Sequence, residues 1–154
     1  MKTFKFFILF LILNFGALFL GSWLMNNGPT SEWYLALNKA PWTPPGWVFG
    51  VAWFSIMLCF SIYLAFLFFE NNTIALKFLY ALQLFLNVIW NYVFFNKHQI
   101  VLGLLIIVLL TILVFVFFFR FKPSQHKTSR YLLLPYMIWL CLATSLNAYI
   151  FLYN

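Results

Sequence analysis

The chain has 154 residues, of which 66% are hydrophobic, 24% are aromatic and only 7% are charged, and its formal net charge is +7. An ordinary soluble domain carries about a quarter charged residues, so this composition is that of an integral membrane protein. No segment remains for a soluble catalytic or nucleic-acid-binding domain, so we interpret the positive charge through membrane topology and expect no nucleic-acid partner.

Five apolar runs are long enough to cross a bilayer, whose hydrocarbon core of about 30 Å needs about 20 helical residues. They cover residues 4–25, 47–69, 78–95, 100–121 and 131–153. We therefore predict an all-α membrane protein: one five-helix transmembrane bundle that occupies residues 1–154 as a single domain.

The first span has two interpretations. It resembles a signal peptide, because Lys2 and Lys5 precede an apolar stretch that ends near the small residues Gly21 and Ser22. Against cleavage, Asn14 lies on the same helical face as Gly21 and Ser22, at i, i+7 and i+8. That pattern favours a retained helix that packs against its neighbours.

The hexapeptide WTPPGW introduces the second span. We predict that Thr43 caps this helix and that Pro44 and Pro45 occupy its first turn, where a missing N–H costs little. Gly46 and Gly50 form a GxxxG pair at the start of the span. Because the pair lies at the extreme end, we favour close helix approach within the chain over dimerisation through it.

The third span carries a polar stripe. Gln83, Asn87, Trp90 and Asn91 recur at i, i+4, i+7 and i+8. Amides that face hydrocarbon would lack hydrogen-bond partners, so this stripe should face other helices or a ligand cavity. The fourth span is almost uniformly apolar over residues 103–119, which is typical of a scaffolding helix in contact with lipid.

The fifth span places Pro135, Trp139, Ala143 and Asn147 at successive i+4 steps. Pro135 removes one backbone hydrogen bond within a helix, so we predict a bend that opens space beside Trp139. Ala143 would leave room for a close neighbour or a flat ligand.

The distribution of charge predicts the orientation. With five spans, one side of the membrane receives the N-terminus and the loops at 70–77 and 120–130. These segments hold most of the basic residues, namely Lys2, Lys5, Lys77, Arg120, Lys122, Lys127 and Arg130. The other side holds only Lys39 and Lys97, so the N-terminus is predicted to be cytoplasmic in a bacterial cell membrane.

Three segments resemble a known family. WYLALNKAPWTPPGWVFGVAW at residues 33–53, QLFLNVIW at 83–90 and LLPYMIWLCLATSLN at 133–147 are similar, in this order, to the motifs of the TspO/MBR family. This family comprises the tryptophan-rich sensory proteins and the translocator proteins. The resemblance implies a five-helix bundle, usually a homodimer, whose pocket is closed by a long lid loop between the first two helices.

The resemblance also implies a ligand. Family members bind porphyrins such as protoporphyrin IX, and many bind sterols and synthetic benzodiazepine-type compounds. The positions matching the family's ligand-binding residues are Tyr34, Pro44, Trp53, Asn87, Trp90, Trp139, Ala143 and Leu146. The expected function is therefore a membrane receptor or sensor, with porphyrin as ligand and no obligatory cofactor.

Two alternatives remain open. Some bacterial members degrade protoporphyrin in light, and that activity would make Trp53 and Trp139 catalytic. Passive translocation of an apolar ligand is the other alternative. Ion-coupled transport is disfavoured because no charged residue lies well inside a span.

Conventional catalysis has little support. There is no nucleophile motif, carboxylate pair or metal-ligand spacing, and His98 and His126 are expected on opposite sides of the membrane. No metal site is therefore expected. Lys39 has two equal interpretations, as a partner for a ligand carboxylate or as an ordinary interfacial lysine.

Two positions depart from the family pattern. Ala40 separates Lys39 from Pro41, whereas the commoner pattern places the proline directly after the lysine. The sterol motif of animal members needs a basic residue beyond a tyrosine, and this sequence ends at Tyr153-Asn154. Sterol recognition of that kind is therefore not supported.

Overall fold

The computed structural model describes residues 2–154 and is all-helical over that range. In chain order the elements are α1 (Lys2–Leu24), the 3-10 turn η1 (Gly28–Thr30), α2 (Glu32–Ala36), α3 (Gly46–Glu70), α4 (Ile74–Asn91), the π-helical turn η2 (Tyr92–Asn96), α5 (Ile100–Arg120), the 3-10 helix η3 (Lys127–Leu133) and α6 (Leu134–Tyr153). Five segments are long and apolar enough to cross a membrane. The predicted five-span, all-α architecture is confirmed.

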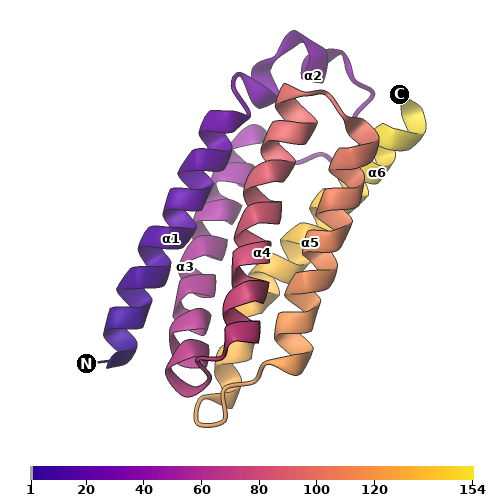
Figure 1. The fold of residues 1–154 in the computed structure, drawn as a ribbon. Helices are drawn as coiled ribbons and strands as arrows, with labels where there is room; N and C mark the ends of the chain where they lie inside the picture. The colour runs from indigo at the N-terminus through magenta and orange to yellow at the C-terminus, as the bar shows by residue number, and fades with distance from the viewer. Residues whose placement is uncertain (1) are drawn as a thin grey trace.

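The five long helices run side by side along one axis (Figure 1). Helix α1 packs against α3 and α4, and α5 packs against α4 and α6. The N-terminal end of α1 lies at the lower end of the bundle in Figure 1, whereas α2 and the C-terminus lie at the upper end. The connections at 71–73 and 121–126 share the lower end, as the alternation of spans requires.

The helix ends are closed by local hydrogen bonds. Thr73 caps α4, since its side chain accepts a hydrogen bond from the backbone N–H of Leu76. At the C-terminal end of α5, the buried hydroxyl of Tyr63 donates to the carbonyls of Phe117, at 3.1 Å, and Phe121, at 2.7 Å. The last carbonyls of a helix lack partners within the helix, so Tyr63 both satisfies this end and ties α3 to it.

Polar side chains join the helices inside the apolar bundle. Asn14 is fully buried; its amide donates to Ser61 at 2.9 Å and accepts from the hydroxyl of Tyr80 at 2.9 Å. Gln83 donates to the hydroxyl of Tyr136 at 2.8 Å. Within hydrocarbon these groups have no water as an alternative partner. Of the polar stripe predicted to face inward, Gln83 and Asn87 are buried and Trp90 and Asn91 are half-buried, so the predicted inward orientation of the stripe is confirmed.

The predicted start of the second span was wrong in detail. Helix α3 begins at Gly46 with Pro45 at the N-cap position, and it has no side-chain cap. The hydroxyl of Thr43 instead donates to the carbonyl of Ala40 at 2.7 Å, which closes a turn ahead of the helix. Pro44 and Pro45 therefore lie before the first helical turn.

The predicted bend at Pro135 was also wrong. Pro135 occupies the first turn of α6, directly after η3. A proline in the first turn removes no hydrogen bond from a helix interior, because that N–H has no partner within the helix.

Close helix approach occurs at other glycines than predicted. Apart from the neighbouring backbone of α3 itself, no atom of the described residues lies within 4 Å of the position that a Cβ would take at Gly46 or Gly50, and both residues are exposed. A Cβ at Gly21 would instead lie 2.8 Å from Nδ2 of Asn91, and one at Gly103 would lie 3.0 Å from the ring of Phe94. The tight contacts therefore join α1 to α4 and α5 to η2.

Candidate functional site

The upper half of the bundle encloses a cavity of about 350 Å³, which we call the bundle pocket. Its walls come from the long helices and from the connection between α1 and α3, residues 25–45. The lining residues are Ala17, Leu18 and Ser22 of α1, Met25, Pro29, Tyr34, Leu35, Lys39, Thr43 and Pro44 of the connection, Gly46, Phe49 and Trp53 of α3, Asn87, Trp90 and Asn91 of α4, Phe95 of η2, Ile107 of α5, and Trp139 and Ala143 of α6. This volume lies within the range of about 300–1,000 Å³ typical of small-molecule pockets.

The bundle pocket brings together seven of the eight residues singled out from the sequence. They come from four separate parts of the chain and are Tyr34, Pro44, Trp53, Asn87, Trp90, Trp139 and Ala143. Leu146 does not line the cavity; it is buried in α6 with 7% of its surface exposed.

Aromatic side chains hold the pocket walls. The ring of Trp139 meets Phe49 edge-on, with centroids 5.1 Å apart, and both side chains line the cavity. On the facing side Trp90 contacts Phe95 edge-on at 5.6 Å. Edge-to-face pairs of this kind fix the ring orientations and present flat apolar faces to the cavity.

The connection packs onto the upper end of the bundle through its own aromatic residues. Trp33 stacks on His98 with centroids 4.2 Å apart, and Tyr34 contacts Phe95 at 5.3 Å. Burial raises the pKa of the Tyr34 phenol above its ordinary value, so this group stays protonated as a hydrogen-bond donor.

Lys39 lies at the rim of the bundle pocket. Its ammonium donates to the carbonyl of Tyr34 at 3.2 Å and to that of Leu35 at 3.4 Å, and it lies 4.9 Å from the centre of the Tyr34 ring. These contacts satisfy the last carbonyls of α2 and keep a positive charge beside the cavity.

The end of α6 fastens the connection in place. The side chain of Asn154 accepts from the backbone N–H of Asn38 at 2.9 Å and donates to its carbonyl at 3.2 Å, while the Asn38 side chain donates to the carbonyl of Tyr153 at 3.0 Å. Further along, the indole N–H of Trp42 donates to Ser145 at 3.2 Å. We call the Asn38–Asn154 contact the latch.

Four buried polar atoms have no hydrogen-bond partner among residues 2–154, namely Oε1 of Gln83, Nε1 of Trp90, Oγ of Ser129 and Oδ1 of Asn147. Of these four residues, Trp90 lines the bundle pocket. A buried donor without a partner costs free energy, so an acceptor on a bound molecule would be favoured beside this indole. The same part of the chain contains no group of three or more His, Cys, Asp or Glu residues placed to hold a metal ion.

Several pocket residues were not identified from the sequence. Phe49 lies one helical turn before Trp53, so its spacing was the available signal. The sequence carries no comparable signal for Phe95, because the π-helical turn η2 changes the helical register that the polar stripe of α4 follows. Met25 and Pro29 belong to an irregular segment, whose path no periodicity predicts.

Comparison with known proteins assigns the chain to a family. The sequence pattern of the TspO/MBR family matches residues 7–153. The chain is 36% identical to protein CrtK of Rhodobacter capsulatus, covering 75% of this chain and 74% of that protein. It is 34% identical to the tryptophan-rich protein TspO of Archaeoglobus fulgidus, with 79% and 80% covered, and 31% identical to the human translocator protein, with 84% and 78% covered. This five-span bundle with its aromatic-lined cavity therefore belongs to the TspO/MBR family of membrane proteins.

Proposed function

We propose that this protein is a membrane receptor or sensor that binds a porphyrin, protoporphyrin IX, in the bundle pocket. The observation that carries the proposal is the convergence of three tryptophans, Trp53, Trp90 and Trp139, on one enclosed cavity. A tetrapyrrole is a large flat π-system, and it gains dispersion and stacking energy against aromatic faces. With this ligand, the connection at residues 25–45 is the lid of the pocket.

The polar groups of the pocket match the edges of such a ligand. The free indole N–H of Trp90 would donate to an acceptor on the bound molecule, and Asn87 offers an amide on the same helix. At the rim, the ammonium of Lys39 would pair with a propionate while the second propionate reaches water. Lys39 is already held beside the cavity by α2, so little side-chain entropy remains to be lost on binding.

A titration with protoporphyrin IX tests this function. The purified protein, in detergent, is titrated while tryptophan fluorescence is recorded. Saturable quenching is expected, because the tryptophans that line the pocket lie next to the ligand. Absence of saturable quenching would refute porphyrin as the ligand.

A second candidate is light-dependent degradation of the bound porphyrin. Trp53 and Trp139 both line the cavity, and the ring of Trp53 lies 5.9 Å from that of Tyr136. A photoexcited ligand would thus lie beside two indoles able to donate an electron. Illumination after the titration separates the two candidates: stable porphyrin absorbance supports a receptor alone, and protein-dependent loss of the absorbance bands supports the chemistry.

We also propose that the lower end of the bundle faces the cytoplasm of a bacterial cell. Seven of the nine basic residues belong to this end, and a cytoplasmic excess of Lys and Arg is the general rule for short loops. The test introduces a single cysteine into a variant that lacks Cys59 and Cys141, and labels intact cells with an impermeant maleimide. The cysteine of Lys97→Cys should react, whereas that of Lys122→Cys should not. The reverse labelling would overturn the orientation.

The resemblance further implies a homodimer, which we include in the proposal. Helix α1 offers a surface for it, because it is the span with the smallest buried share and exposes large apolar side chains such as Ile12, Phe19 and Trp23. Lipid alone could also cover such a face. The mass of the protein–detergent complex distinguishes a dimer from a monomer surrounded by lipid.

A further inference from the structure

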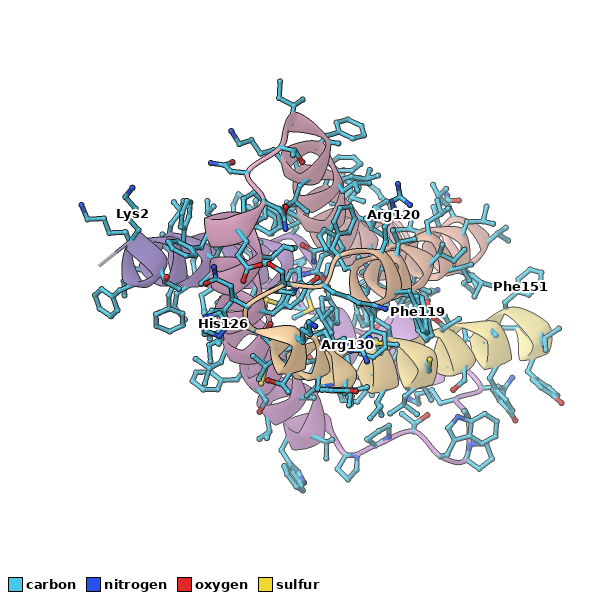
Figure 2. The ribbon with its side chains drawn as sticks, turned by 90° about the horizontal axis from the view of Figure 1, so that it is seen from below. Lys2, Phe119, Arg120, His126, Arg130 and Phe151 are labelled. Atoms are coloured by element: carbon cyan, nitrogen blue, oxygen red, sulfur yellow. The ribbon has the colours of Figure 1, made fainter. Side chains whose placement is uncertain are left out.

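A second cavity lies at the opposite end of the molecule from the bundle pocket. It has a volume of about 440 Å³ and lies between the end of α5 and the start of α6. Its polar lining consists of Lys122, Ser124, Lys127, Thr128, Arg130 and Tyr131. We call it the basic pocket; Figure 2 shows this end of the bundle from below, with Arg130 labelled.

The charge of the basic pocket is not neutralised by its own lining. Lys122, Lys127 and Arg130 contribute three cations, and no carboxylate lines the cavity. The sequence has only two acidic residues, and one of them, Glu32, belongs to α2 at the upper end. The other is Glu70, at the end of α3.

Glu70 serves to fold the loop that forms the basic pocket. One of its carboxylate oxygens accepts hydrogen bonds from the backbone N–H and the hydroxyl of Ser124, the latter at 2.7 Å. The other oxygen accepts from the backbone N–H of Gln125 at 3.1 Å. Both oxygens are therefore engaged by the loop at residues 124 and 125, which lie between Lys122 and Lys127 in the sequence.

Arg130 is held by aromatic rings. Its guanidinium lies 5.4 Å from the ring centre of Phe118 and 4.9 Å from that of Tyr131, and it donates to the Tyr131 hydroxyl at 3.0 Å. A guanidinium has five N–H donors in a fixed plane, so one hydrogen bond leaves most of them free. A planar donor group held in this way is suited to the oxygens of a phosphate.

The surroundings of the basic pocket are those of a membrane interface. Its lining residues follow the candidate span Ile100–Arg120 and continue into the start of the next one, Lys127–Tyr153. A segment that joins two spans is expected at the level of the lipid headgroups. Tyr131 of the lining is 49% exposed, and the helices on either side of the loop expose Phe119 near the end of α5 and Leu134 at the start of α6, with 61% and 39% of their surfaces accessible. These side chains would contact acyl chains while the three cations face the headgroup.

We propose that the basic pocket binds the phosphate group of an anionic phospholipid. The general excess of positive charge at one end of a membrane protein explains why basic residues occur here. It does not explain why three of them line one cavity. Nor does it explain why two aromatic rings fix the guanidinium of Arg130, or why Glu70, the only nearby carboxylate, is used to fold the loop. Attraction between juxtamembrane basic residues and anionic lipid supplies the driving force.

The test compares two triple variants that lose the same charge at the same end of the bundle. Lys122→Gln, Lys127→Gln and Arg130→Gln are combined in the first variant. Lys2→Gln, Lys5→Gln and Lys77→Gln are combined in the control, since none of these lysines lines the cavity. Native mass spectrometry in detergent measures the apparent affinity for dioleoyl phosphatidylglycerol, with dioleoyl phosphatidylcholine as the zwitterionic comparison.

The first variant should bind phosphatidylglycerol at least about tenfold more weakly than the wild type, and the control variant less than about twofold more weakly. The reason is that the first variant loses charge-assisted hydrogen bonds to the phosphate, whereas the control loses only diffuse positive charge. The phosphatidylcholine affinity should change little in both. Equal losses in the two variants, or none in the first, would overturn the proposal. Full competition by millimolar inorganic phosphate would also overturn it, because the site would then take free phosphate rather than lipid.

Two single variants, Lys127→Gln and Arg130→Lys, with Lys77→Gln as their control, keep the test decisive if the first triple variant does not fold, as judged by its melting temperature. Lys127→Gln alters one exposed side chain and should weaken phosphatidylglycerol binding about twofold to fivefold, whereas Lys77→Gln should leave it unchanged. Arg130→Lys keeps the charge but loses the planar donor group, so it should also weaken binding. Wild-type affinity in both Lys127→Gln and Arg130→Lys would contradict the proposal.

Discussion

A single buried amide, that of Asn14, connects three helices. It is fully buried, and it links α1 to Ser61 of α3 and Tyr80 of α4. Asn14→Ala would leave the hydroxyl of Tyr80 without its acceptor in an apolar interior, whereas the hydroxyl of Ser61 would keep its bond to the carbonyl of Met57 at 2.7 Å. We expect a loss of about 1–2 kcal/mol in the free energy of unfolding, measured by denaturation in detergent.

Ser55→Ala is the matched control for Asn14→Ala. Ser55 is exposed, and its hydroxyl donates only to the carbonyl of Val51 on its own helix, at 2.8 Å. Its removal should change stability by less than about 0.5 kcal/mol. Similar losses for Asn14→Ala and Ser55→Ala would show that the amide does not link the helices energetically.

Trp139 is the residue at which binding and photochemistry are separated. Its ring lines the bundle pocket and is oriented by Phe49. Trp139→Phe reduces the aromatic face, so the affinity for protoporphyrin IX should fall about fivefold, near 1 kcal/mol. If the porphyrin is also degraded in light, the rate of that loss at saturating ligand should fall further than the affinity.

Trp23→Phe provides the comparison for Trp139→Phe, because Trp23 lies on α1 with 70% of its surface exposed and does not line the pocket. It should leave both the affinity and the illuminated absorbance at their wild-type values. An equal effect of the two substitutions would remove Trp139 from the proposed site.

The connection between α1 and α3 is held by elements that lie far from it in the sequence. The latch joins Asn38 to Asn154, which are 116 residues apart. Asn154→Ala removes two hydrogen bonds between the connection and α6. If the connection is the lid of the pocket, protoporphyrin should dissociate about threefold to tenfold faster, measured by stopped-flow fluorescence.

Asn72→Ala is a suitable control for the latch, since Asn72 is an exposed residue of the connection between α3 and α4 at the lower end. It should not change the dissociation rate. An unchanged rate in Asn154→Ala would mean that ligand release does not require the connection to move away from α6.

The elements differ in how well the sequence predicts them. The long helices follow from hydropathy alone, because a span must satisfy its own backbone hydrogen bonds across the full bilayer. The roles of Thr43 and Pro135 were predicted wrongly because each residue type is compatible with two local structures. Thr43 closes a turn rather than capping a helix, and Pro135 begins a helix rather than bending one.

The predicted site residues come together in the folded bundle because helical spacing and family motifs both select the inner faces of the helices. Trp53, Asn87 and Trp139 lie on three different helices and still line one cavity. The latch and the basic pocket depend on how loops fold against helix ends, which no periodicity encodes. The structure therefore adds two features at the ends of the bundle to a site whose walls the sequence predicts.

If the bundle pocket holds the porphyrin, a side chain that fills the pocket must displace it. Ala143 lines the cavity, whereas Cys141, two residues earlier on α6, is exposed on the outside of the bundle. Quenching of tryptophan fluorescence by protoporphyrin IX is measured for Ala143→Phe and for Cys141→Phe. Ala143→Phe should weaken binding at least about tenfold because its ring takes ligand space, while Cys141→Phe should bind as the wild type does. Wild-type affinity in Ala143→Phe, with the protein folded, would contradict the claim.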